Sequence, residues 1–222
     1  MTIFVHTQKI HDDQYQVHWA FRDFTAGSVT VSFSQQHTED RKICAEVLAL
    51  TQVLERFPRS AADIVTSHGA MKKALKDRSR RGGTEICFLR ICHPELSFVS
   101  SKHTLRHIER VKTLPKVQET HLQMSWQSLG RPVIPTPIGD IEVTEHAFFR
   151  LRERFKPTAN LKWIAREVSK RGLQRVRDYR ASLPFLKDKK RARDYSLYRL
   201  TGTDIQFLLA DHGQVKRLTT CY

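Results

Sequence analysis

The periodic spacing of apolar residues that is typical of helices and strands is interrupted between positions 114 and 141. This stretch holds four prolines and two glycines: Pro115, Pro132, Pro135, Pro137, Gly130 and Gly139. Proline lacks a backbone N–H and fixes φ, and glycine is conformationally permissive, so both interrupt helices and strands. The 222 residues of the chain also exceed the size of a typical domain, about 100–150 residues. We therefore expect two domains, 1–113 and 142–222, joined by a proline-rich connection at 114–141.

The charge of the chain is strongly positive and unevenly distributed. Thirty-eight Lys and Arg face 23 Asp and Glu, which gives a formal net charge of +15. Residues 1–60 hold 6 basic and 7 acidic side chains, residues 61–120 hold 12 and 6, and residues 121–222 hold 20 and 10. Such a surface attracts polyanions, and nucleic-acid phosphates release counterions when Lys and Arg neutralise them. We expect a nucleic-acid partner, RNA or DNA, rather than a merely solvated basic face.

The sequence lacks the features of membrane and metal-binding proteins. No run approaches the ~20 apolar residues of a membrane helix, and residues 1–10 have no signal-peptide pattern. We expect a soluble cytoplasmic protein with no membrane partner. The four cysteines have no C-x-x-C spacing, and neither Cys92-His93 nor the pair His103 and His107 is accompanied by further ligands. Disulfides, a metal and a cofactor are therefore not expected.

Residues 1–113 show strand and helix patterns in turn. Three segments alternate with period two and are predicted to be antiparallel strands: 3–5, 15–21 and 29–33. A helix is predicted over 43–54, ended by Pro58. The later elements predicted are a strand, a short basic helix, a strand and a helix, at 62–66, 70–76, 86–91 and 105–111. The expected order is β-β-β-α-β-α-β-α.

Three strands, a helix and further β/α units form the pattern of the ribonuclease-H-like α/β fold, and residues 1–113 resemble that family. Its members hold two metal ions with carboxylates from the first strand, the first helix and the fourth strand. Only Glu46, in the first helix, matches: residues 3–7 contain no aspartate, and Ser67 stands where the fourth-strand aspartate is expected. The resemblance implies a catalytically degenerate domain for RNA docking, dimerisation or restraint. Glu46 is then expected to be a solvated helix residue.

The segment 144–155 has the pattern of an amphipathic helix. Thr144 is the predicted N-cap, and one apolar stripe is formed by Ala147, Phe148, Leu151 and Phe155. His146, Arg150 and Arg154 stand four residues apart on another face, where side chains at this spacing are neighbours. We expect these three side chains to converge.

The rest of the second domain is predicted to be one helix and three strands. The helix covers 160–171, and the strands, with a hairpin turn at 211–213, are 196–200, 205–210 and 215–220. The expected order is α-α-β-β-β. The expected fold class is therefore α+β or α/β: an N-terminal mixed sheet with helices, and a small C-terminal α+β domain of two helices followed by antiparallel strands.

Residues 140–222 resemble the RelE-like members of the barnase–colicin–RelE-type ribonuclease toxins. The resemblance rests on this order of elements and on a first helix with the pattern His-Ala-x-x-Arg-x-x-x-Arg. Such enzymes cut RNA without metal: a general base takes the 2′-hydroxyl proton, the oxygen attacks the adjacent phosphate, and basic groups stabilise the charge. The resemblance implies that His146 is the acid/base group and that Arg150 and Arg154 clamp the phosphate. A last-strand hydroxyl, from Thr219, Thr220 or Tyr222, adds a contact, with Thr219 favoured.

The implied function is a metal-independent, toxin-like endoribonuclease. The alternatives are a nucleic-acid-binding protein without activity, such as a regulator or mobile-element factor, an interaction module, and a solvated charged face. An antitoxin-like or other protein partner and a homodimer are also open. Two basic runs are candidate nucleic-acid contacts. The first is either a flexible arm that binds the backbone or only a basic loop, and it holds Lys72, Lys73, Lys76, Arg78, Arg80 and Arg81. The second holds Lys187, Lys189, Lys190, Arg191 and Arg193.

Overall fold

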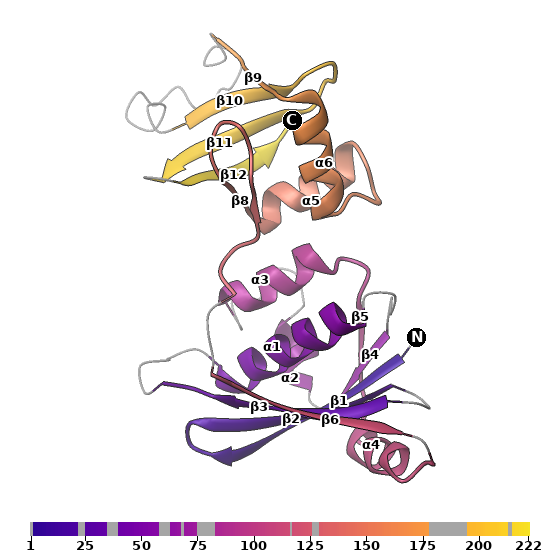
Figure 1. Cartoon of the computed structure of the whole chain (residues 1–222). Coiled ribbons are helices and arrows are strands. Elements are labelled where there is room, and N and C mark those ends of the chain that lie inside the picture. Colours follow the sequence, from indigo (N-terminus) through magenta and orange to yellow (C-terminus); the bar gives the residue numbers. More distant parts are fainter. Residues whose placement is uncertain are drawn as a thin grey trace. The chain divides into compact units, whose positions relative to one another are not determined.

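The chain forms two compact units, Met1–Gly130 (unit 1) and Arg131–Tyr222 (unit 2), each with its own mixed sheet and helices (Figure 1). The fold class is therefore mixed α+β. None of the described helices combines the length and the apolar character that a membrane crossing requires. The computed structural model describes residues 2–21, 25–34, 40–57, 63–67, 69–74, 83–115, 117–125, 129–177, 195–212 and 215–222.

Unit 1 is built on a six-stranded sheet with the strand order β5-β4-β1-β2-β3-β6. The first three strands are antiparallel, as their alternating sequences predict: β1 (Thr2–His11), β2 (Gln14–Phe21) and β3 (Thr25–Ser32). The other three strands make parallel pairs. The strand β4 (Asp63–Thr66) pairs with β1, β5 (Ser97–Ser100) pairs with β4, and β6 (Gln118–Ser125) pairs with β3.

Helices cover both faces of this sheet (Figure 1). On one face lie α1 (Arg41–Arg56), α2 (Gly69–Ala74) and α3 (Gly83–Cys92), and on the other lies α4 (Thr104–Lys112). Asp40 caps α1 by accepting a hydrogen bond from the backbone N–H of Ile43 at 3.4 Å. The inward side chains of β1 to β3 and of α1 form one buried core, which includes Trp19 and Phe21.

Two segments of unit 1 were assigned the wrong secondary structure. Residues 86–91 were predicted to be a strand but lie in α3, where Ile86 and Leu89 join the core one helical turn apart. A short apolar run has no period that separates a buried strand from a buried helix. Residues 118–125 were assigned to the connection, yet they form β6, whose Leu122 and Met124 pack against the core. The period-two pattern of this segment is short, and the prolines on either side of it led to its assignment to the connection.

Unit 2 has a six-stranded sheet in the order β7-β8-β12-β11-β10-β9. Its strands are β7 (Val133–Ile134), β8 (Ile141–Val143), β9 (Leu173–Arg175), β10 (Tyr195–Leu200), β11 (Gln206–His212) and β12 (Val215–Cys221). Its helices are α5 (Glu145–Arg154), which packs on β12, and α6 (Leu161–Arg171), which packs on β10 and β7. The two helices and the three long strands lie where the sequence predicts them.

The expectation of purely antiparallel strands in unit 2 was wrong. The short strand β8 precedes α5 and pairs in parallel with β12, through partners such as Glu142 and Arg217. The strand β7 was not predicted because it lies among the prolines assigned to the connection, and β8 was not predicted because it has only three residues and crosses the predicted boundary at 142. Unit 2 accordingly begins at Arg131, eleven residues before the predicted boundary at 142.

Candidate functional site

The start of α5 is fastened to the middle of the second sheet by Thr144. Its hydroxyl group accepts a hydrogen bond from the backbone N–H of Ala147 at 3.3 Å and donates one to the carbonyl oxygen of Leu218 at 2.7 Å. The backbone N–H of Thr144 donates to the same carbonyl oxygen at 3.3 Å. These bonds satisfy groups that a helix start leaves unpaired and fix the first turn of α5 against β12.

The buried side of α5 determines which side chains face solvent. Ala147, Phe148 and Leu151 are fully buried. His146, in the first turn, and Arg154, in the last, are exposed, and Arg150 between them is partly exposed. Each step of four residues advances about 6 Å along a helix. His146, Arg150 and Arg154 therefore form a row along the outer face of α5, which we call the α5 row.

The two arginines of the α5 row are held by different partners. Nη1 of Arg150 lies 2.8 Å from Oε2 of Glu153, one turn further along the same helix. Nη1 of Arg154 donates a hydrogen bond of 3.1 Å to the carbonyl oxygen of Cys221, and its guanidinium carbon lies 5.9 Å from the ring centre of Tyr222. The row shares one face, but the expected convergence of all three groups on a single point is not observed.

Thr219 is not placed to contact a substrate through its hydroxyl proton. The strand register runs from Leu208↔Thr220 to Leu209↔Leu218, so Thr219 is the extra residue of a β-bulge. Its Oγ1 donates a hydrogen bond of 2.9 Å to the carbonyl oxygen of Leu208. Strand alternation does not reveal this bulge, and a role of Thr219 at the site stays a prediction.

Tyr222, the third of the last-strand candidates, does border the α5 row. Its backbone N–H and carbonyl oxygen each make a 2.9 Å hydrogen bond with the backbone of Gln206, which continues the pairing with β11 past the end of β12. Burial raises the pKa of the Tyr222 hydroxyl, and Arg154 opposes that shift. Tyr222 therefore presents a protonated phenol beside a guanidinium group, and both can donate to a phosphate oxygen.

The basic runs predicted to bind nucleic acid fall mostly outside the described residues. Lys72 and Lys73 lie in α2, and Lys73 is exposed. The remaining nine candidates lie outside the described residues: Lys76, Arg78, Arg80, Arg81, Lys187, Lys189, Lys190, Arg191 and Arg193. The sequence analysis missed another basic surface, on α6, where Lys162, Arg166 and Lys170 are exposed. Its signal was the four-residue spacing of the three cations.

Glu46 of unit 1 is buried, with 2% of its surface exposed, so the expectation of a solvated helix residue was wrong. The Thr7 hydroxyl donates a hydrogen bond of 2.9 Å to its Oε2, and the Thr66 side chain also hydrogen-bonds to the carboxyl group. Among the described residues its Oε1 has no partner. Burial raises the pKa of Glu46 to about 7, against the effect of the two threonines and Lys42.

Thr7 and Thr66 therefore flank Glu46 from the first and fourth strands of the sheet. Ser67, expected at the fourth-strand position, instead accepts or donates a hydrogen bond of 2.8 Å with Nδ1 of His6. Within the described parts of the chain, no group of three or more His, Cys, Asp or Glu side chains is arranged to hold a metal ion. The hydroxyls beside Glu46 are neutral, and neutral hydroxyls are weaker ligands for divalent cations than carboxylates are.

Comparison of the chain with protein-family models, curated proteins and solved structures gave no match. The geometry and charge of the two units are therefore the basis of the functional proposal.

Proposed function

We propose that unit 2 is a metal-independent endoribonuclease whose active face is the α5 row. The observation that carries this proposal is the bond between Arg154 and the carbonyl oxygen of Cys221. It joins the end of α5 to the end of β12 and sets the Arg154 guanidinium group beside the Tyr222 ring. His146 and Arg150 continue the row along the same face of α5. These are the group types that take a proton from a hydroxyl and stabilise a phosphate dianion.

In the proposed reaction His146 takes the proton of a ribose 2′-hydroxyl. The 2′-oxygen attacks the adjacent phosphorus and the bond to the 5′-oxygen breaks. The 5′-oxygen takes a proton from solvent and leaves as a hydroxyl group, and the imidazolium form of His146 returns its proton to solvent. The products are a 2′,3′-cyclic phosphate and a 5′-hydroxyl end. Arg150 and Arg154 stabilise the negative charge that develops on the phosphate oxygens, because planar guanidinium groups donate to two oxygens at once.

The ion pair of Arg150 with Glu153 does not exclude a phosphate. The side chains of Arg150 and Glu153 are 40% and 64% exposed. Exposed ion pairs contribute only about 0–1 kcal/mol, so Arg150 exchanges the carboxylate for a phosphate at small cost.

A second candidate function, nucleic-acid binding without cleavage, is favoured by the length of the α5 row. His146 and Arg154 are eight residues apart, which corresponds to about 12 Å along the helix axis. Groups spread over this distance suit successive phosphates of a strand as well as one reacting phosphate. In this case Arg150→Glu weakens binding but no RNA product forms with any variant.

The ribonuclease-H-like assignment of unit 1 is supported by its order of elements, three antiparallel strands followed by a helix and parallel β/α units. The lack of an aspartate in residues 3–7, and Ser67 at the expected fourth-strand position, support a domain without metal-dependent activity. Its proposed role is to dock RNA or to restrain unit 2.

The proposal is tested by RNA cleavage in excess chelator with the wild-type chain, His146→Ala and His103→Ala. His103 is a matched control, because it is an exposed histidine beside the start of α4 whose side chain makes no capping bond. We expect the wild-type chain and His103→Ala to cleave RNA and His146→Ala to lose at least about 100-fold in rate. Equal rates for all three variants, or no cleavage by the wild-type chain, would remove the α5 row as an active site.

A further inference from the structure

The helix α6 presents a line of cations to solvent. Ile164 and Val168, each 2% exposed, pack into unit 2. Lys162, Arg166 and Lys170 are exposed and stand four residues apart. Because a four-residue step advances about 6 Å, these three side chains form a line about 12 Å long. We call them the α6 stripe.

The positive charge of the α6 stripe continues past the end of the helix. Between positions 161 and 177 the chain holds six basic residues and a single acidic one, Glu167. Arg175 and Arg177, after the helix, are both exposed. Like charges repel one another on a folded surface, and a partner of opposite sign relieves that repulsion.

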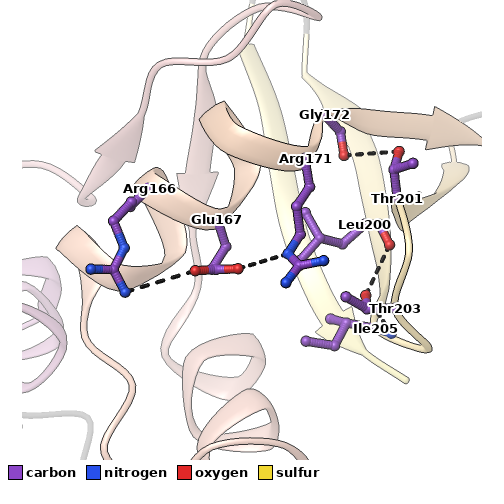
Figure 2. Close-up of polar contacts among 8 residues, drawn as sticks. All are labelled: Arg166, Glu167, Arg171, Gly172, Leu200, Thr201, Thr203 and Ile205. Atoms are coloured by element: carbon purple, nitrogen blue, oxygen red, sulfur yellow. Dashed lines mark hydrogen bonds and ion pairs between the residues drawn. The ribbon is translucent and has the colours of Figure 1, made fainter.

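The one carboxylate in this region is already engaged by its own helix (Figure 2). Glu167 is 15% exposed and lies 2.8 Å from Nε of Arg171 and 3.8 Å from Nη2 of Arg166. Both contacts come from neighbours on α6, and the side chains of Lys162 and Lys170 point to the solvated face. The carboxylate therefore partly neutralises Arg166, through the longer of its two contacts, and among the described residues it forms no ion pair with Lys162 or Lys170.

The C-terminal end of α6 is also anchored to the sheet, which fixes the direction of the stripe. Gly172 ends the helix with a φ of +75°, and its carbonyl oxygen accepts hydrogen bonds from the backbone N–H and the hydroxyl of Thr201, at 3.2 and 3.3 Å. Thr203 closes the same turn by donating to the carbonyl oxygen of Leu200 at 2.8 Å (Figure 2). The helix end is thus held by the turn between β10 and β11.

We infer that the α6 stripe, with Arg175 and Arg177, is a docking surface for the phosphodiester backbone of RNA. This inference rests on the RNA partner proposed for unit 2 and adds a surface outside the α5 row. Charge complementarity is its basis: phosphates recur every few ångströms along a nucleic-acid strand, and Lys and Arg that neutralise them release condensed counterions. The contacts are to the backbone, so the surface holds RNA without selecting its sequence.

A second row of cations supplies a matched control. Lys102, Arg106 and Arg110, at and before α4 in unit 1, are exposed and have the same four-residue spacing. This row differs in having Glu109, an exposed carboxylate, directly beside it. Changing either set of three residues to glutamine removes three positive charges, and glutamine is a good helix former.

The experiment compares RNA binding by the wild-type chain, by Lys162→Gln/Arg166→Gln/Lys170→Gln and by Lys102→Gln/Arg106→Gln/Arg110→Gln. Fluorescence anisotropy with a labelled single-stranded RNA is recorded over a range of salt concentrations, after circular dichroism shows that both variants are folded. We expect the α6 variant to bind roughly tenfold more weakly and its log K against log salt slope to fall by about 2. We expect the α4 variant to change affinity by less than about twofold.

The outcomes separate this inference from the proposed function. Equal losses in the two variants, or an α6 variant that binds as the wild-type chain does, would overturn the inference while RNA binding stands. A wild-type chain that does not bind RNA overturns both. If the α6 variant loses affinity and no variant cleaves RNA, the docking surface is supported and the cleavage proposal fails.

Discussion

Arg154 of α5 donates a hydrogen bond of 3.1 Å to the carbonyl oxygen of Cys221, the last residue of β12. The same guanidinium group faces the ring of Tyr222 at 5.9 Å. Together with the bonds of Thr144 to Leu218 at the other end of α5, this contact holds the helix along the strand at both of its ends. The position of the α5 row relative to the C-terminal residues therefore depends on Arg154.

Arg154→Ala is expected to lower the free energy of unfolding of unit 2 by about 1 kcal/mol, because one charge-assisted hydrogen bond at an exposed position is lost. Arg199→Ala is the control, since Arg199 is an exposed arginine on β10 of the same unit. Urea unfolding followed by circular dichroism measures both. Equal stability of the two variants would show that the contact between α5 and the end of β12 contributes nothing to stability.

Glu46 is expected to make unit 1 less stable as the pH rises through neutrality. Burial raises the pKa of its carboxyl group from the ordinary value of 4.5 to about 7. The folded chain thus holds this proton more tightly than the unfolded chain does. Its stabilising effect is complete below pH 4.5, decreases as the pH rises and is lost above about pH 7, by at most on the order of 3 kcal/mol.

Glu46→Gln removes this titration while keeping a similar size and an acceptor for the Thr7 hydroxyl. We expect the variant to be more stable than the wild-type chain at pH 8 and close to it at pH 4.5. Hydrogen exchange of the β1 and β2 amides reports the opening of unit 1 at each pH. Glu55→Gln, at an exposed position of α1, is the control. A wild-type-like pH profile for Glu46→Gln would contradict the burial of a proton-binding carboxyl group.

Gly27 of β3 is expected to tolerate no side chain. A Cβ atom at this position would collide with the carbonyl oxygen of Thr120 in β6 and lie 2.7 Å from Cζ2 of Trp19. Gly27→Ala is therefore expected to lower the free energy of unfolding of unit 1 by about 1–3 kcal/mol. Thermal unfolding is the measurement. An unchanged melting temperature would contradict the close parallel pairing of β3 with β6.

The sequence predicted the elements of unit 1 whose patterns are long. The strand β2 and the helix α1 extend over eight and sixteen residues, and both were predicted with slightly shorter bounds, 15–21 and 43–54. The error at α3 has a physical cause, because Ile86 and Leu89 lie in an apolar run that fits either period. The missed strand β6 is fixed by its pairing with β3, which is a long-range contact that local patterns do not contain.

The sequence predicted the α5 row but not its contacts. Helical periodicity places His146, Arg150 and Arg154 on one face, and the buried stripe of α5 confirms that placement. The contact of Arg154 with Cys221 joins residues 67 positions apart. The bulge that turns Thr219 toward Leu208 depends on the pairing of β11 with β12. Tertiary structure therefore decides which last-strand residue borders the row.

The proposed cleavage of RNA by unit 2 requires the 2′-oxygen as nucleophile and His146 as the acid/base group. This is tested with one RNA strand and the same strand with a single 2′-deoxy nucleotide at the cleaved position, both in excess chelator. We expect cleavage of the RNA to a 2′,3′-cyclic phosphate and no cleavage at the deoxy position. If both strands are cleaved at equal rates, or neither is cleaved, unit 2 does not cut RNA by this reaction.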